Sequence, residues 1–131
     1  MSAPTLAVLA LTVHQRSREL EVQFQQGDQP PEAPYRIPFE LLRVRSPSAE
    51  VQGHGPGQET VQTGKADVGI SAIQPVGNYG IKPLFTDGHD SGIYTWPYLY
   101  DLATRQGTHW QAYDALLARE GLQRDGRSAQ P

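Results

Sequence analysis

Glycine and proline interrupt this chain so often that it can fold only into short helices and strands separated by turns. Thirteen glycines and eleven prolines occur among 131 residues, above an average combined usage of about 12 %. They follow no fixed period, which excludes collagen-like and low-complexity architectures. Because the length suits one domain with its own core, the sequence predicts a loop-rich single domain with many fixed turns.

Charge and cysteine content exclude several classes of function. Eleven Lys and Arg stand against fourteen Asp and Glu, and cysteine is absent. The missing basic excess argues against nucleic-acid binding. Without cysteine there is no disulfide, no thiol nucleophile and no cysteine-held zinc or iron–sulfur cluster.

Apolar runs indicate a chain outside the membrane. No segment approaches the ~18 apolar residues of a membrane span. The N-terminal run over residues 6–13 is short and lacks the basic flank of a secretory signal. We therefore expect a cytoplasmic protein with no membrane partner.

The first half of the chain predicts three strands and one short helix. Leu20, Val22 and Phe24 alternate with polar residues, which is typical of a half-buried strand. The predicted strands cover residues 6–13, 18–24 and 35–37. A helix over 39–43 follows Pro38, which suits the first helical position, and residues 46–65 are predicted as an irregular loop.

The second half predicts a hairpin followed by helices. Strands over 68–75 and 79–85 flank Gly77-Asn78, a pair that tolerates the positive φ of a tight turn. A helix is predicted to start at Thr95, to run to about Arg105 and to stop at Gly107. A second one is predicted from the capping box that begins at Thr108, and it ends at Gly121.

This order of elements predicts an α+β fold. We expect a small, mainly antiparallel sheet with helices packed on one face and helices at the C-terminus. One domain is predicted over residues 1–122. Residues 123–131 lack apolar periodicity and are predicted to form a disordered tail.

Four separated motifs carry a family resemblance. They are residues 42–54 (LRVRSPSAEVQGH), Gly64-Lys65, residues 75–79 (PVGNY) and residues 87–99 (DGHDSGIYTWPYL). In order and spacing they resemble the gamma-butyrobetaine hydroxylase-like N-terminal domain, over residues 10–105. A similar domain occurs at the C-terminal end of plant P-loop ATPases that carry iron–sulfur clusters, and free-standing members have no assigned activity.

The resemblance does not imply hydroxylase activity. In the full-length hydroxylases this domain precedes a jelly-roll domain that holds the iron and the 2-oxoglutarate. The present chain closes near the end of the small domain, so we expect the catalytic half to be absent. The sequence also contains no nucleophile-elbow pattern around Ser46, Ser48 or Ser91, and no enzyme activity is predicted.

The resemblance also implies a position for a structural zinc. In the hydroxylases, three cysteines and a histidine hold the ion, and they align with Ser46, Ser48, Val51 and His89. Serine is a poor zinc ligand and valine is none. The zinc site of the hydroxylases is therefore not expected here.

Two interpretations of the remaining polar side chains stay open. Two imidazoles and a carboxylate can hold zinc or iron, and the candidate ligands are Glu50, His54, Asp87, His89 and Asp90. Alternatively, hydroxyls, carboxylates and imidazoles join the same loops by hydrogen bonds without a metal. The second interpretation is the prediction, with no cofactor.

The same loops provide candidates for a partner surface: Arg43, Arg45, Ser46, Ser48, Tyr94 and Tyr98. The alternative for the arginines is a solvated surface of mixed charge. For the aromatic residues it is burial beside Leu99 and Leu102 at helical spacing.

The sequence favours an accessory or adaptor domain that acts through a protein partner. Its working face would combine residues 46–54 with residues 87–94. The link to iron–sulfur ATPases suggests assistance in metal or cluster handling, which is analogy of family. The alternatives are a metal-binding domain that uses His54 and His89, and a regulatory domain that acts in trans on a 2-oxoglutarate oxygenase.

Overall fold

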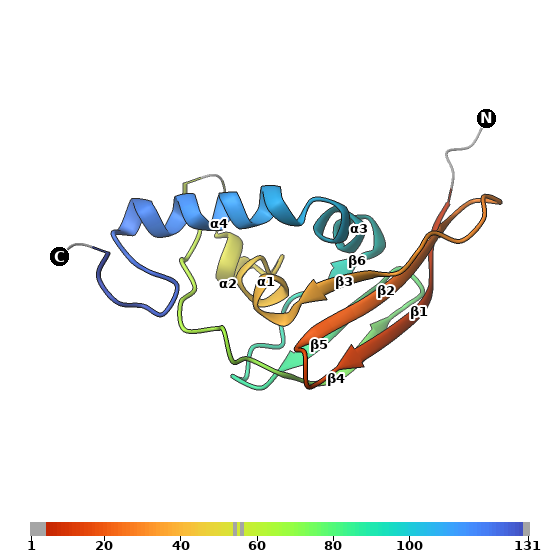
Figure 1. Ribbon diagram of the computed structural model, residues 1–131, viewed down its shortest axis with the longest axis horizontal. Helices are drawn as coiled ribbons and strands as arrows, with labels where there is room; N and C mark the ends of the chain where they lie inside the picture. Colours follow the sequence, from red (N-terminus) through yellow and green to blue (C-terminus); the bar gives the residue numbers. More distant parts are fainter. Residues whose placement is uncertain (1–4, 54, 56, 130–131) are drawn as a thin grey trace.

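The computed structural model describes residues 5–53, 55 and 57–129 and shows an α+β fold. Within these residues, six strands form two three-stranded antiparallel sheets, and four helices lie on one side of them (Figure 1). The strands are β1 (Leu6–His14), β2 (Glu19–Gln26), β3 (Tyr35–Pro38), β4 (Ile70–Val76), β5 (Gly80–Phe85) and β6 (Tyr94–Thr95). The helices are α1 (Phe39–Val44), α2 (Ala49–Gln52), α3 (Trp96–Thr104) and α4 (Gln106–Glu120). The predicted fold class is confirmed.

The first sheet has the order β1-β2-β3 and follows the predicted alternation. Leu20, Val22 and Phe24 point inward and are fully buried. Val13 and Leu11 of β1 lie opposite Leu20 and Val22, so the apolar faces of the two strands coincide. A register shift between Val8 and Ala10 bends β1 at the edge of this sheet.

The second sheet has the order β4-β5-β6. Gly77, at φ 52°, makes the predicted tight turn between β4 and β5. Gly80 lies opposite Thr95 of β6, and a Cβ at this glycine would lie 2.7 Å from the Tyr94 carbonyl oxygen. The close approach of β6 therefore needs glycine at position 80.

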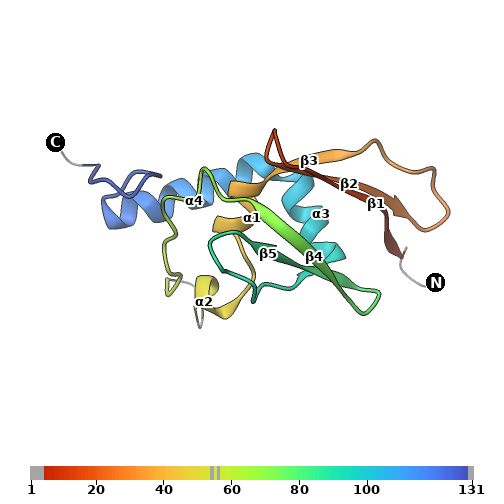
Figure 2. The same cartoon turned by 90° about the horizontal axis from the view of Figure 1, so that it is seen from below.

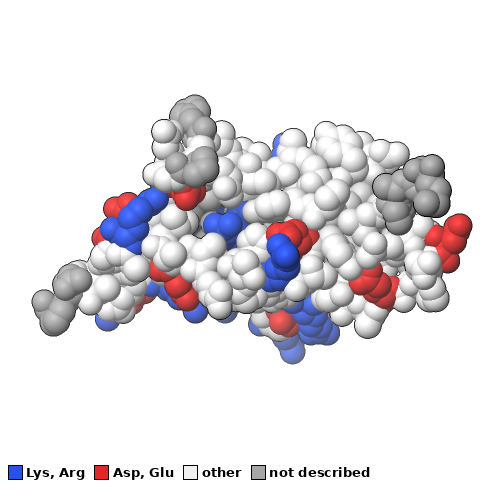
Figure 3. Space-filling view, turned by 90° about the horizontal axis from the view of Figure 1, so that it is seen from above, with Lys and Arg blue, Asp and Glu red and all other residues white. Residues whose placement is uncertain are grey.

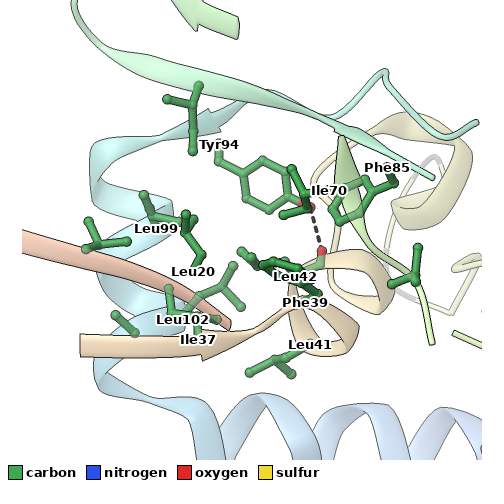
Figure 4. Close-up of a cluster of buried hydrophobic side chains, with 14 of the residues drawn as sticks. Leu20, Ile37, Phe39, Leu41, Leu42, Ile70, Phe85, Tyr94, Leu99 and Leu102 are labelled. Carbon is green, nitrogen blue, oxygen red and sulfur yellow. Dashed lines mark hydrogen bonds between the residues drawn. The ribbon is translucent and has the colours of Figure 1, made fainter. Parts of the chain in front are cut away.

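The core lies between the two sheets and the helices α1 and α3 (Figure 4). The Tyr94 side chain extends across this core, and its hydroxyl donates a hydrogen bond to the carbonyl oxygen of Leu42. Truncating one of the large core side chains to alanine costs about 2–5 kcal/mol. The largest fully buried ones are Tyr94, Tyr113, Phe24, Phe39, Leu20, Ile37, Leu41, Leu42, Ile70, Ile81, Leu99 and Leu102.

Helices α3 and α4 meet at a different point from the one predicted. Thr95 caps α3 as expected, since its hydroxyl accepts a hydrogen bond from the Tyr98 N–H. However, α3 ends at Thr104, and Arg105 alone separates it from α4. The predicted last residue of this helix, about Arg105, agrees with the observed end. Gly107 and Thr108 lie inside α4, so the predicted stop at Gly107 and the capping box at Thr108 are wrong. The buried His109 bonds to Asp101 of α3 and fixes the first turn of α4 by tertiary contact.

Two short elements lie where the sequence predicts none. Helix α2 is a single turn inside the predicted 46–65 loop, and β6 has only two residues. Neither is long enough to show a period of hydrophobicity. Both depend on contacts with distant segments: Thr60 N–H donates to the Val51 carbonyl oxygen, and β6 pairs with β5.

The segment after α4 folds back toward α1. The helix ends at Glu120, and Gly121, the predicted stop, follows it with left-handed backbone at φ 65°. Arg124 then pairs with Glu40 of α1 and lies 4.6 Å from the Trp110 ring centroid. Figure 2 shows this turn at the far end of α4. The boundary at residue 122 and the disorder of residues 123–131 stay predictions.

No helix in the described part of the chain combines the length and apolar character needed to cross a membrane.

Candidate functional site

Two segments far apart in the sequence meet beside the end of α1. Ser46, just before α2, places its Oγ 2.8 Å from Nε2 of His89, which lies in the loop after β5. Ser46 is 0 % exposed and His89 is 7 % exposed. A buried hydrogen bond thus joins the two loops, residues 46–54 and 87–94, that the sequence predicts to form the working face.

Further contacts continue this pair on both sides. The Ser48 N–H donates to Ser46 Oγ at 3.3 Å, and His89 Nδ1 lies 3.5 Å from Glu50 Oε2. A neutral imidazole with its proton on Nδ1 accounts for both contacts, because Nε2 then accepts the Ser46 hydroxyl proton. Burial lowers the pKa of His89, and the Arg43 guanidinium lowers it further, while Glu50 and Asp87 oppose the shift.

Asp87 joins the same loop to two cationic side chains. Its Oδ2 accepts from Arg43 Nε at 2.9 Å and from Lys65 Nζ at 2.6 Å. Its Oδ1 accepts the His89 N–H at 3.2 Å. Burial alone raises the pKa of Asp87, but the hydrogen bonds from Lys65, from the His89 backbone and from Arg43 bring it down to about 2.

The Arg43 side chain lies inside the protein. Only 7 % of it is exposed, so the interpretation of the arginines as a solvated surface of mixed charge is wrong for this residue. The reason is the carboxylate of Asp87, which compensates a buried guanidinium. Within the described residues, Arg43 Nη1 and Ser48 Oγ are buried without a protein hydrogen-bond partner.

A second buried histidine fastens the end of α1 to α3 and α4. Arg45 Nε donates to His109 Nδ1 at 3.2 Å, and His109 Nε2 lies 2.7 Å from Asp101 Oδ2. The Tyr98 hydroxyl donates to the Arg45 carbonyl oxygen. Since Nδ1 accepts, the proton of a neutral His109 is on Nε2, where it binds Asp101.

Ser46, His89 and Glu50 have the connectivity of a nucleophilic triad but not the access. Ser46 Oγ faces the backbone of Gly92, where a Cβ would lie only 2.4 Å from it. The whole Ser46 residue is 0 % exposed to solvent. A substrate carbonyl cannot reach a serine closed off in this way. The arrangement therefore holds loops together and presents no reactive oxygen.

The described fold and these motifs match a known family. The model of gamma-butyrobetaine hydroxylase-like N-terminal domains matches residues 11–100. The chain belongs to this family. This match confirms the resemblance seen in the four sequence motifs. It also agrees with the expectation of a family whose function is not assigned.

Three solved structures resemble this family member. Two proteins studied by NMR share 44 % and 42 % identity, with TM-scores of 0.74 and 0.75. The first alignment covers 93 % of this chain and 87 % of the other, and the second covers 99 % and 98 %. A crystal structure of a protein of unknown function from Acidithiobacillus ferrooxidans shares 34 % identity at a TM-score of 0.57, covering 73 % and 91 %. Among curated proteins, none matches the chain.

The residues at the zinc positions of the hydroxylases do not fit a zinc ion. Of Ser46, Ser48, Val51 and His89, only His89 is a good zinc ligand, and its Nε2 is bound to Ser46. Val51 is buried and apolar. Across residues 5–53, 55 and 57–129, no three His, Cys, Asp or Glu side chains are grouped so that they could hold a metal.

None of the other proposed metal ligands that the structure describes is buried. His54 lies outside the described residues. Glu50 has 72 % of its side chain exposed, and Asp90 is also exposed. Asp87 directs both oxygens at Arg43, Lys65 and the backbone of His89.

The six residues proposed as a partner surface point mainly inward. Four of them are buried: Arg43, Ser46, Ser48 and Tyr94. Arg45 and Tyr98 are half-buried and join α1 to α3 and α4. The same two loops expose other side chains instead, namely Glu50, Asp90 and Ile93.

Exposed charges on the α4 side of the molecule are mixed in sign. Seen from above (Figure 3), basic and acidic side chains form small scattered patches on a mostly uncharged surface. Arg119, for example, lies beside Glu120 at 3.1 Å. That view shows no extended field of one sign among the residues it describes.

Proposed function

We propose that this protein is a non-catalytic accessory module of the cytoplasm that binds a protein partner. The partner surface is the exposed rim of the two joined loops, and its exposed side chains are Ile93, Glu50 and Asp90. The observation that carries the proposal is the exposure of Ile93, 41 % open to solvent in a loop whose neighbouring residues are fixed. A large apolar side chain that a fixed loop presents to solvent is a candidate anchor for a partner.

Rigidity of the loops supports this choice. Gly92 packs against Ser46 and Pro47, and Tyr94 on the other side of Ile93 is fully buried. Ile93 is therefore held between two fixed positions. A preorganised anchor loses little conformational entropy when it binds.

Charge suggests the chemistry of the partner. Glu50 and Asp90 are exposed acidic side chains on the same two loops. Acidic groups at the rim of an interface favour a basic surface on the partner and accelerate association at low salt. We therefore propose a protein with a small apolar pocket surrounded by Lys or Arg.

The test places a photo-crosslinking amino acid at position 93, and at position 9 as a matched control. Leu9 is 47 % exposed on β1, so it tests apolar exposure away from the loops. A protein captured from position 93 in the producing cells is purified, and its affinity is measured by calorimetry. Ile93→Asp is expected to weaken binding at least tenfold, and Leu9→Asp less than twofold.

Two results would contradict the proposal. One is capture of the same partner from position 9 but not from position 93. The other is an unchanged dissociation constant for Ile93→Asp while circular dichroism shows a folded variant.

The identity of the captured partner also tests two more specific roles, namely metal or cluster handling and regulation of an oxygenase. Assistance in metal or iron–sulfur cluster handling, suggested by the domain at the end of the plant ATPases, requires a partner that carries or assembles such a centre. A captured 2-oxoglutarate oxygenase would instead favour regulation in trans.

A further inference from the structure

We infer that the Ser46–His89 pair is a hydrogen-bonded replacement for a metal centre. In this chain the loops around α2 and after β5 are fixed by protein groups alone, and the folded state needs no metal ion. The inference is independent of the proposed partner, because it concerns what holds the loops and not what they bind.

The distance between the two side chains leaves no place for an ion between them. Ser46 Oγ and His89 Nε2 are 2.8 Å apart, which is a direct hydrogen bond. Two ligands of one tetrahedral zinc, each at about 2.0–2.2 Å, lie ~3.4 Å from each other. The observed contact is the shorter one, and it uses the lone pair with which Nε2 would bind a metal.

Position 51 contributes packing where a ligand would be needed. The Val51 side chain is 4 % exposed. Its N–H donates to the Ser48 carbonyl oxygen and its own carbonyl oxygen accepts from Thr60. The turn of α2 is thereby closed by backbone hydrogen bonds and a buried apolar side chain.

The local charges also oppose a divalent cation. The buried Arg43 guanidinium lies close enough to His89 to disfavour positive charge on the imidazole. Lys65 adds a second cation on the same carboxylate, Asp87. Both Asp87 oxygens are occupied by hydrogen bonds, and the Glu50 and Asp90 carboxylates lie mostly in solvent. These three carboxylates are therefore poorly placed to offset two further positive charges.

The first test uses the untagged wild-type protein. Elemental analysis is expected to find no stoichiometric zinc or iron. The melting temperature is expected to change by less than about 1 °C with EDTA or with equimolar zinc, because a ligand stabilises only the state that binds it. A stoichiometric metal, or a melting temperature that falls with EDTA, would overturn the inference.

The second test restores thiolates at the replaced positions. The variant with Ser46→Cys, Ser48→Cys and Val51→Cys is expected to bind one zinc with His89. With cobalt it should show thiolate-to-metal absorption bands, and its melting temperature should rise with zinc. The same variant with His89→Ala is the matched control and should bind at least tenfold more weakly.

Each outcome of the second test is decisive. A triple variant that folds but binds no zinc would show that the four positions do not form one centre, and would overturn the inference. A triple variant that folds only when zinc is supplied supports it. Equal zinc affinity with and without His89 contradicts it.

Discussion

At the scale of single residues, the Asp87 carboxylate holds the joined loops together by three hydrogen bonds. It accepts hydrogen bonds from Arg43 and Lys65, which come from α1 and from the segment before β4. It also fixes the backbone of His89. One carboxylate therefore positions three segments and compensates a buried guanidinium.

Replacing this carboxylate should destabilise the fold strongly. Asp87→Ala leaves the Arg43 charge buried and unpaired, and we expect a loss of about 3 kcal/mol in the free energy of unfolding. Urea denaturation measures it. Asp67→Ala is the control, because Asp67 pairs with Arg18 at the exposed surface and should change stability by less than about 0.5 kcal/mol. Equal effects of the two substitutions would contradict the role of Asp87.

The lowered pKa of His89 predicts a pH dependence with a definite sign. The unfolded chain binds the proton more readily than the folded one, so stability should fall as pH drops below about 6.5. Asp87 contributes separately, near pH 2 to 4. Urea midpoints at pH 7.5 and 5.5 measure the slope, and His89→Gln should flatten it. The same slope in wild type and variant would show that His89 is not its source.

How far the sequence predicts individual residues depends on the separation of their partners. Family resemblance placed Ser46 and His89 together correctly, 43 positions apart. Burial of Arg43 could not be predicted, since nothing in the local pattern indicates that Asp87, 44 positions away, lies beside it. The same holds for His109 and Arg45. Pairs of this kind form only once the elements have packed.

At the scale of elements, the turn after α4 acts as a fastening between α4 and α1. Arg124 pairs with the buried Glu40 and lies over Trp110. Its carbonyl oxygen accepts the N–H of Gly64. Three parts of the chain thus meet at one residue near the C-terminus.

Removing this fastening should weaken the domain. Arg124→Ala is expected to cost about 2 kcal/mol, because Glu40 loses its partner and the cation–π contact is lost. Thermal unfolding measures it, with Arg127→Ala as the exposed control. Truncation after Leu122 should have a similar effect. An unchanged melting temperature for the truncated chain would instead support a disordered tail from residue 123.

The sequence predicts well those elements that carry a period or a local stop signal. The strands β1 and β2, the β4–β5 hairpin, the start of α3 and the end of α4 at Gly121 follow from alternation, Gly-Asn and cap residues. The boundary between α3 and α4 does not, because tertiary contacts of His109 outweigh the local capping box. Elements of two to four residues, β6 and α2, have no period to detect.

At the scale of the whole molecule, the strands divide into two sheets that cover the same helices. The predicted α+β class holds, but composition and periodicity cannot say which strand edges pair. Along the sequence, the segment from α1 to the loop before β4 lies between the strands of the first sheet and those of the second. The edges β1 and β4 consequently belong to different sheets, and Gln15 connects them by donating to the Ile70 carbonyl oxygen.

This arrangement places the joined loops at the point where helices and second sheet meet. Tyr94 extends from β6 to Leu42 of α1 through the core, and His89 extends from the loop after β5 to Ser46. The loops are therefore anchored in the core from two directions. The exposed residues Glu50, Asp90 and Ile93 project from this anchored base.

A double-mutant cycle on Ser46 and His89 tests the central claim, that protein groups alone join these loops. Unfolding free energies of Ser46→Ala, His89→Ala and the double variant give the coupling between the two side chains. We predict that His89→Ala costs about 1–3 kcal/mol. We also predict a coupling of about 1 kcal/mol that is the same with EDTA and with zinc. A coupling near zero, or one that appears only when metal is present, would contradict the account.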